Sequence, residues 1–271
     1  MPIMRIIALT LAIAAFVATP AVHAADVEVD VELVLAVDVS RSMSPRELEI
    51  QRRGYASALT SPEVIKVIRS GLLGRIAVTY FEWAGRHSHR TIVPWTLVET
   101  AQDAERIALK LTAQFDPSLR RTSISGALRH GAQQFVDNGF AGMRRVIDVS
   151  GDGPNNNGGA VIAARDAALE QGIIINGLPL MTREGMGTRF HITDLDEYYR
   201  ACVVGGPGSF VIPVRSWEEF PQAVPQKLVL ELASNPILPK RAAFKATRPD
   251  GTVDCMVGER IWDFYFRDWA Q

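Results

Sequence analysis

Three oxygen-bearing side chains stand close together near the amino terminus of this sequence. Asp38, Ser40 and Ser42 directly follow an apolar run that is typical of a buried parallel strand. One carboxylate and two hydroxyls are hard oxygen donors, and no thiol or imidazole accompanies them. Such a set suits Mg²⁺, Mn²⁺ or Ca²⁺ rather than Zn²⁺ or Cu²⁺. The segment does not establish a site by itself, because serine and aspartate also follow strands as ordinary turn and capping residues.

A helix is expected directly after this cluster. Ser44 can cap it, Pro45 suits its first position and Glu47 completes a capping box. The cluster therefore lies in a strand-to-helix loop at the carboxyl end of a strand, which is where open α/β sheets bind ligands.

Two later segments offer oxygen donors in equivalent places. Thr122 lies in the loop before a predicted helix, and Asp152 follows the predicted strand 144–149. If the first and fourth strands are neighbours, their carboxyl ends flank the point where the strand order reverses. All five side chains would then converge on one ion.

The pattern of the remaining chain predicts an α/β fold with a doubly wound, mainly parallel sheet. Apolar strand-like runs alternate with amphipathic helical patterns, which indicates helices on both faces of the sheet. Residues 90–94 end in Pro94 and fit an antiparallel edge strand. Residues 209–214 are predicted to form a last strand, and residues 216–232 a last helix.

The first 24 residues have the pattern of a cleaved export signal. Arg5 precedes the apolar run 6–21, and small residues follow at 22–24. The run is short and alanine-rich for a membrane span, although a retained anchor is the alternative. We therefore expect a periplasmic or secreted protein with no membrane span after cleavage of residues 1–24.

The 271 residues, 47% of them hydrophobic, suit one large domain at 25–233 and a C-terminal extension at 234–271. A net charge of -1 favours no nucleic acid as a partner. We expect the aromatic side chains of the extension to pack onto the domain, and a surface for partner docking is the alternative. The aromatic cluster consists of Trp262, Phe264, Tyr265, Phe266 and Trp269.

The chain contains two cysteines, Cys202 and Cys255. An oxidising compartment would let them form a disulfide, which would tie the extension to the domain across a loop of about fifty residues. Two free buried thiols are the alternative.

The five oxygen donors resemble the metal-ion-dependent adhesion site of von Willebrand factor type A domains. That site combines a D-x-S-x-S loop, a separate threonine and an aspartate in a T-D-G-like turn. Asp38, Ser40 and Ser42 match the loop, Thr122 matches the threonine, and Asp152 in S-G-D-G matches the second aspartate. The resemblance covers about residues 32–232, and within the superfamily the chain is similar to exported bacterial proteins whose domain has no assigned function.

The resemblance implies a metal-dependent binding module rather than an enzyme. Ser40, Ser42 and Thr122 would touch an Mg²⁺, Mn²⁺ or Ca²⁺ ion directly, and Asp38 and Asp152 would act mostly through water. An Asp or Glu carboxylate of a protein partner would complete the coordination. A metal-assisted hydrolase that uses an ion-activated water, or a structural domain with an unoccupied site, are the alternatives.

Other catalytic patterns fit poorly. A phosphotransferase nucleophile at Asp38 would need a second carboxylate where Ser40 stands, and the chain has neither a nucleophile elbow nor a glycine-rich phosphate loop. His87 and His89 are expected in a solvated hairpin. His130 and His191 stand alone in the sequence and are expected to be structural.

Overall fold

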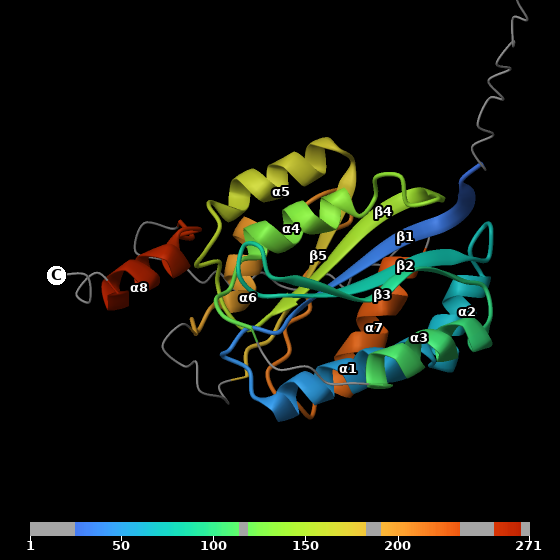
Figure 1. The fold of residues 1–271 in the computed structure, drawn as a ribbon, viewed down its shortest axis with the longest axis horizontal. Helices are drawn as coiled ribbons and strands as arrows, with labels where there is room; N and C mark the ends of the chain where they lie inside the picture. The colour runs from blue at the N-terminus through green and yellow to red at the C-terminus, as the bar shows by residue number, and fades with distance from the viewer. Residues whose placement is uncertain (1–24, 114–118, 183–190, 234–251, 267–271) are drawn as a thin grey trace, which may run out of the picture.

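A mainly parallel β-sheet lies between two layers of helices in the computed structural model (Figure 1). The structure describes residues 25–113, 119–182, 191–233 and 252–266. The predicted export signal, residues 1–24, lies outside the described residues.

The sheet has five strands in the order β3-β2-β1-β4-β5. β3 runs antiparallel to β2, and all the other neighbouring pairs are parallel. The predicted doubly wound sheet with one antiparallel edge strand is therefore confirmed. The strands are β1 (Val27–Asp38), β2 (Ile76–Trp83), β3 (His89–Val98), β4 (Phe140–Gly151) and β5 (Ile173–Pro179).

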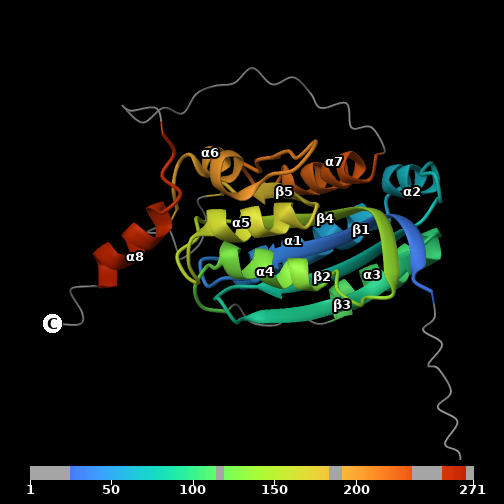
Figure 2. The ribbon, with the colours of Figure 1, turned by 90° about the horizontal axis from the view of Figure 1, so that it is seen from above.

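Helices cover both faces of the sheet. α1, α2, α3 and α7 lie on one side, and α4, α5 and α6 on the other (Figures 1 and 2). The helices are α1 (Pro45–Leu59), α2 (Pro62–Arg69), α3 (Ala101–Ala113), α4 (Ile124–Gln133), α5 (Val161–Glu170), α6 (Leu195–Tyr198) with a π-helical turn at Tyr199–Val203, α7 (Phe220–Leu232) and α8 (Val257–Phe266).

The central strand β1 explains why its sequence is a continuous apolar run. Leu33 and Leu35 pack into the core beneath α1, α3 and α7, whereas Val34 and Ala36 pack into the core beneath α4 and α5. A strand that is buried on both faces needs apolar side chains in both directions. β1 therefore places Asp38 at the end of a strand that is packed on both faces.

The capping box at the start of α1 forms as predicted. The hydroxyl of Ser44 accepts a hydrogen bond from the Glu47 amide, and the Glu47 carboxylate accepts one from the Ser44 amide at 2.6 Å. The second carboxylate oxygen of Glu47 accepts from the indole N–H of Trp217 at 2.9 Å. The end of the 38–44 loop is thus held both by its own helix and by the segment before α7.

The predicted last strand, residues 209–214, is wrong as a regular strand. This segment runs beside β5 but pairs with it only at isolated positions, Val211 with Gly177 and Val214 with Leu180. Pro179 lies between these two points and has no amide hydrogen with which to continue the ladder. The regular hydrogen bonding of the sheet therefore ends at β5.

The predicted disulfide between Cys202 and Cys255 is present, and it joins α8 to the body of the protein. The expectation that the aromatic cluster packs onto the domain is only partly correct. Trp262 lies against Arg121, with 5.0 Å from guanidinium carbon to ring centroid, but Phe264 is 76% exposed. α8 projects from the body, so only one of its sides has the domain to contact (Figure 2). The side chain of Phe266 and all of Trp269 lie outside the described residues.

A fully buried charge cluster lies between β4 and α7, and nothing in the sequence pattern pointed to it. Lys227 pairs with Asp148 and, at 2.6 Å, with Glu231. Burial, together with the nearby Asp148 carboxylate, raises the pKa of Glu231 to about 8. Burial likewise raises the pKa of Asp148. One lysine thus faces two carboxylates, so one of them holds a proton near neutral pH.

The raised pKa of Glu231 predicts that stability falls as the pH rises from 5 to 8. The folded state binds the Glu231 proton more tightly than the unfolded chain does, so the free energy of unfolding falls by as much as about 1.4 kcal/mol per pH unit in this range. Urea unfolding at several pH values should show this slope in the wild type. The slope should be smaller in Glu231→Gln, although not zero because of Asp148. Equal slopes in the two proteins would contradict the assignment.

Candidate functional site

The first loop of the candidate site begins where β1 ends. Asp38 is completely buried, and one of its carboxylate oxygens accepts a hydrogen bond from the Ser40 amide at 2.7 Å. This contact turns the chain directly after the strand. The hydroxyl oxygens of Ser40 and Ser42 then lie 2.9 Å apart. The alternating spacing of the three residues thus places the two hydroxyls side by side above the end of β1.

The second loop of the site follows β4, the neighbour of β1. Asp152 accepts a hydrogen bond from the hydroxyl of Ser42 at 2.8 Å, across 110 residues of sequence. Gly151 makes the close approach possible, because a Cβ atom there would lie 3.0 Å from a carboxylate oxygen of Asp38 and 3.0 Å from the hydroxyl of Tyr199. The structure therefore joins Asp38, Ser40, Ser42 and Asp152 in one cluster.

Thr122 lies in a third loop that is bonded to both of the others. The amide of Leu119 donates to the carbonyl of Val39 at 2.8 Å. The amide of Thr122 donates to the side-chain oxygen of Asn156 at 3.0 Å, and the amide of Asn156 donates back to the carbonyl of Thr122 at 2.9 Å. Thr122 is buried between the loops. Direct contact of its hydroxyl with an ion stays a prediction.

The cluster brings two carboxyl groups together without a lysine or arginine beside them in the described structure. Burial and the neighbouring Asp152 carboxylate raise the pKa of Asp38 well above its usual range. One oxygen of Asp38 is buried without a hydrogen-bond partner. Among the described residues, no lysine or arginine pairs with Asp38 or Asp152. A buried carboxylate without a partner is costly, and a bound cation would remove that cost.

The donor set indicates which cation fits. In the described part of the chain, no three His, Cys, Asp or Glu side chains gather into a metal-binding group. An ion at this position would therefore depend on the hydroxyls of Ser40 and Ser42 in addition to the two carboxylates. Hydroxyl and carboxylate oxygens suit Mg²⁺, Mn²⁺ or Ca²⁺, as the sequence predicted.

The expectation that His191 stands alone is wrong. Its Nε2 atom lies 3.5 Å from a carboxylate oxygen of Asp152, although the two residues are 39 positions apart. No motif surrounds His191, so its place became visible only from the fold. His191 also lines a cavity of about 420 Å³ beside Asp152, together with the exposed Arg215 and the apolar side chains Leu180, Met181 and Ile192.

The expectations for the other histidines are also partly wrong. The rings of His89 and His130 stack in parallel with centroids 4.3 Å apart, so His130 has a partner and His89 is not simply solvated. Burial, with a contribution from His130, lowers the pKa of His89 to about 4. Both rings also pack against Phe81. A neutral stacked pair of this kind fits a structural role rather than the metal site.

Comparison with solved structures shows the same von Willebrand factor type A-like fold in pilus proteins and in a matrix protein of the mussel byssus. The pilus adhesin SpaC from Lactobacillus rhamnosus GG aligns with a TM-score of 0.53 at 12% identity, over 77% of this chain and 32% of that one. A D319A mutant of the PilB minor pilin from Streptococcus sanguinis gives 0.53 at 12%, over 75% and 62%. Proximal thread matrix protein 1 from the mussel byssus, with a zinc-occupied MIDAS motif, gives 0.50 at 12%, over 77% and 47%.

These similarities establish the fold alone, and the chain spans less than two thirds of each of these structures. No curated protein matches the chain. A sequence profile described as a protein of unknown function, DUF1194, matches residues 28–236, which contain all five candidate site residues. The protein therefore belongs to the DUF1194 family and carries its candidate site on a von Willebrand factor type A-like fold.

Proposed function

We propose that this protein is a binding module of the adhesion type that captures an acidic group of a partner protein through a divalent cation. The observation that carries the proposal is the cluster of Asp38, Ser40, Ser42 and Asp152, in which a buried oxygen of Asp38 lacks a partner. A cation is the group that would balance these two carboxylates. Mg²⁺ is the ion we favour, with Mn²⁺ or Ca²⁺ as substitutes.

The five residues of the candidate site would have two different roles toward a bound ion. The family resemblance assigns direct contact to Ser40, Ser42 and Thr122, and water-mediated contact to Asp38 and Asp152. Neutral hydroxyl ligands leave most of the ion's charge uncompensated, so a bound ion would supply an electrophilic position for a carboxylate. The buried carboxylates hold the hydroxyls in place, as the 2.8 Å bond from Ser42 to Asp152 illustrates.

The cavity beside Asp152 offers room for the partner. The exposed Arg215 lines it and would attract an acidic side chain, while Met181 and Ile192 would contact apolar groups next to that side chain. We therefore propose that the partner presents an Asp or Glu flanked by apolar residues.

We further propose that the protein works outside the cytoplasm, in the periplasm or as a secreted protein. The disulfide between Cys202 and Cys255 favours an oxidising compartment. The pilus proteins with a similar fold support an envelope or extracellular setting. Among the helices that the structure describes, none is long and apolar enough to cross a membrane.

Calorimetric titration with Mn²⁺ tests the proposal directly. Replacing Ser42 with Ala removes a hydroxyl from the cluster, so we expect the affinity to fall at least about tenfold. Ser57→Ala changes an exposed serine on α1 and is the matched control. The wild type and the control should also capture a partner from the producing cell's envelope in a Mg²⁺-dependent manner, whereas Ser42→Ala should not. Absence of Mn²⁺ and Mg²⁺ binding at millimolar concentration would leave only a structural domain.

A metal-assisted hydrolase is the second candidate, and the position of His191 favours it. The imidazole lies 3.5 Å from Asp152, where it could serve as a general base beside an ion-activated water. Turnover of phosphoester or peptide substrates that is lost on chelation and in His191→Asn would support this function. A binding module should show no such turnover, and its Mn²⁺ affinity should change little in the same variant.

A further inference from the structure

We infer that α8 is part of the support of the candidate site, and that Asn155, Asn156 and Trp262 are positioning residues for Thr122 and Asp152. The family profile ends at residue 236, and α8 covers Val257–Phe266, so α8 lies outside the region that defines the family. The effect on metal affinity rests on the function proposed above. The effect on the loops themselves does not.

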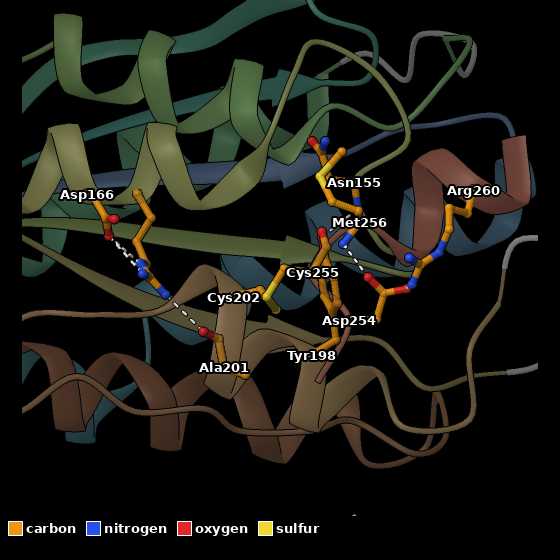
Figure 3. The surroundings of a disulfide bond; sticks show 10 residues. Asn155, Asp166, Tyr198, Ala201, Cys202, Asp254, Cys255, Met256 and Arg260 are labelled. Carbon is orange, nitrogen blue, oxygen red and sulfur yellow. Dashed lines mark hydrogen bonds and ion pairs between the residues drawn. A yellow bond between two sulfur atoms is a disulfide. The ribbon is translucent and has the colours of Figure 1, made fainter. Parts of the chain in front are cut away.

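The base of α8 is fastened to the body beside the sheet. Cys255 is bonded to Cys202 in the π-helical turn that follows α6 (Figure 3). Val253, Cys255 and Val257 pack against the core on the α4 and α5 side. The hydroxyl of Tyr198 lies near this junction, 3.5 Å from the Cys255 carbonyl, and it also accepts a hydrogen bond from the Asn155 amide at 3.2 Å. The disulfide thus adjoins the loop that follows Asp152.

The first turn of α8 packs directly against the loop that follows Asp152. The side-chain amide of Asn155 donates to the Glu259 carboxylate at 2.6 Å. A Cβ atom at Gly258 would lie only 2.1 Å from the carbonyl oxygen of Asn155, so no other residue fits there without movement. Asn155 is fully buried, and its side-chain oxygen accepts from the Ser125 amide at 2.9 Å. α8 is therefore connected through one side chain to the start of α4.

A second contact leads from α8 to Thr122. The guanidinium of Arg121 lies over the ring of Trp262. Arg121 has a φ of 71°, a left-handed conformation that costs energy for a residue with a side chain. Since Arg121 directly precedes Thr122, its backbone conformation decides the direction in which Thr122 enters the site. Asn156 forms two hydrogen bonds with the backbone of Thr122.

These contacts make the order of the site dependent on α8. Without α8, the guanidinium of Arg121 would lose its contact with the Trp262 ring, and the side chain of Asn155 would lose its hydrogen bond to Glu259. The loops that carry Thr122 and Asp152 would then sample more conformations, and a cation would have to order them on binding. A weaker metal affinity is the expected result.

Two substitutions on the same helix test the inference. Trp262→Ala removes the ring over Arg121, whereas Phe264→Ala removes a side chain that is 76% exposed and is the matched control. We expect Mn²⁺ affinity to fall about two- to fivefold in Trp262→Ala, which is the size of an exposed cation–π contact, and to stay unchanged in the control. Trp262→Phe keeps an aromatic face and should restore most of the affinity.

Hydrogen exchange of the metal-free proteins provides a second readout. The amides of Thr122 and Ser125, which donate to Asn156 and Asn155, should exchange faster in Trp262→Ala than in Phe264→Ala. Reduction of the disulfide should speed the same amides further and lower Mn²⁺ affinity by about tenfold, since the chain has no other cysteine.

The outcomes separate this inference from the proposed function. If the wild type binds no Mn²⁺ but the exchange difference is present, the proposed function fails and the positioning role stands. If the wild type binds Mn²⁺ and the two substitutions behave alike in both measurements, the positioning role is overturned and the metal site stands.

Discussion

Replacing Asp38 with Asn is expected to destroy metal binding and, at the same time, to stabilise the metal-free protein. Asn keeps the oxygen that accepts from the Ser40 amide, but it replaces a completely buried carboxyl group whose raised pKa shows that its ionised form is costly there. In the wild type the ionised form of Asp38 faces the Asp152 carboxylate, and one oxygen of Asp38 has no hydrogen-bond partner. We expect a gain of about 1–3 kcal/mol in the free energy of unfolding without metal.

The loss of metal binding should be large in the same variant. Removing one of two carboxylates from the cluster should weaken Mn²⁺ binding by about 100-fold or more. Calorimetric titration and thermal unfolding, each with and without Mn²⁺, measure the two effects separately. Addition of Mn²⁺ should raise the unfolding temperature of the wild type and leave that of Asp38→Asn unchanged.

Asp30→Asn is the matched control, because Asp30 lies on the same strand at the opposite end of the sheet. Its carboxylate accepts hydrogen bonds from the amides of Leu73 and Arg75. The control should therefore lose stability and keep its metal affinity. A lower free energy of unfolding for Asp38→Asn than for the metal-free wild type would contradict this interpretation. It would show that the two carboxyl groups do not destabilise the protein in the absence of a cation.

Replacing Lys227 with Met is expected to cause a large loss of stability. Lys227 is completely buried between Asp148 and Glu231, which are buried as well. Met has a similar length but leaves the two carboxylates without their cation, and breaking a buried pair in this way costs about 3–5 kcal/mol. The unfolding temperature should fall by roughly 10 °C.

The pH dependence of this loss identifies its cause. Protonation of Asp148 and Glu231 would relieve the unpaired charge, so the loss should be smaller at pH 5 than at pH 8. Lys66→Met on the exposed face of α2 is the control, and it should change stability by no more than a few tenths of a kcal/mol. The double variant Lys227→Met, Glu231→Gln should recover part of the loss. A pH-independent loss would indicate poor packing of Met instead.

Local patterns in the sequence determined the elements and the chemistry of the donors. The run before Asp38 predicts a strand that is buried on both faces, and Ser44 with Glu47 predicts the start of α1, because each pattern acts within a few residues of itself. The types and spacing of Asp38, Ser40 and Ser42 predict hard-cation chemistry for the same reason. The disulfide was predictable because the chain has one possible pair of cysteines.

The tertiary structure decided which distant segments meet. Asp152 reaches Ser42 because β4 packs beside β1, and the fold places His191 beside Asp152 although 39 positions separate them. The disulfide fixes α8 to the body of the protein, and Trp262 of α8 then contacts Arg121. No local sequence pattern indicates that contact. The meeting of Asp152 with Ser42 was expected from the strand order and the family resemblance. The contacts of His191 and α8 depend on the packing of surfaces far apart in the chain, so no sequence pattern indicated them. The supports of the site, unlike its donors, could therefore be read only from the fold.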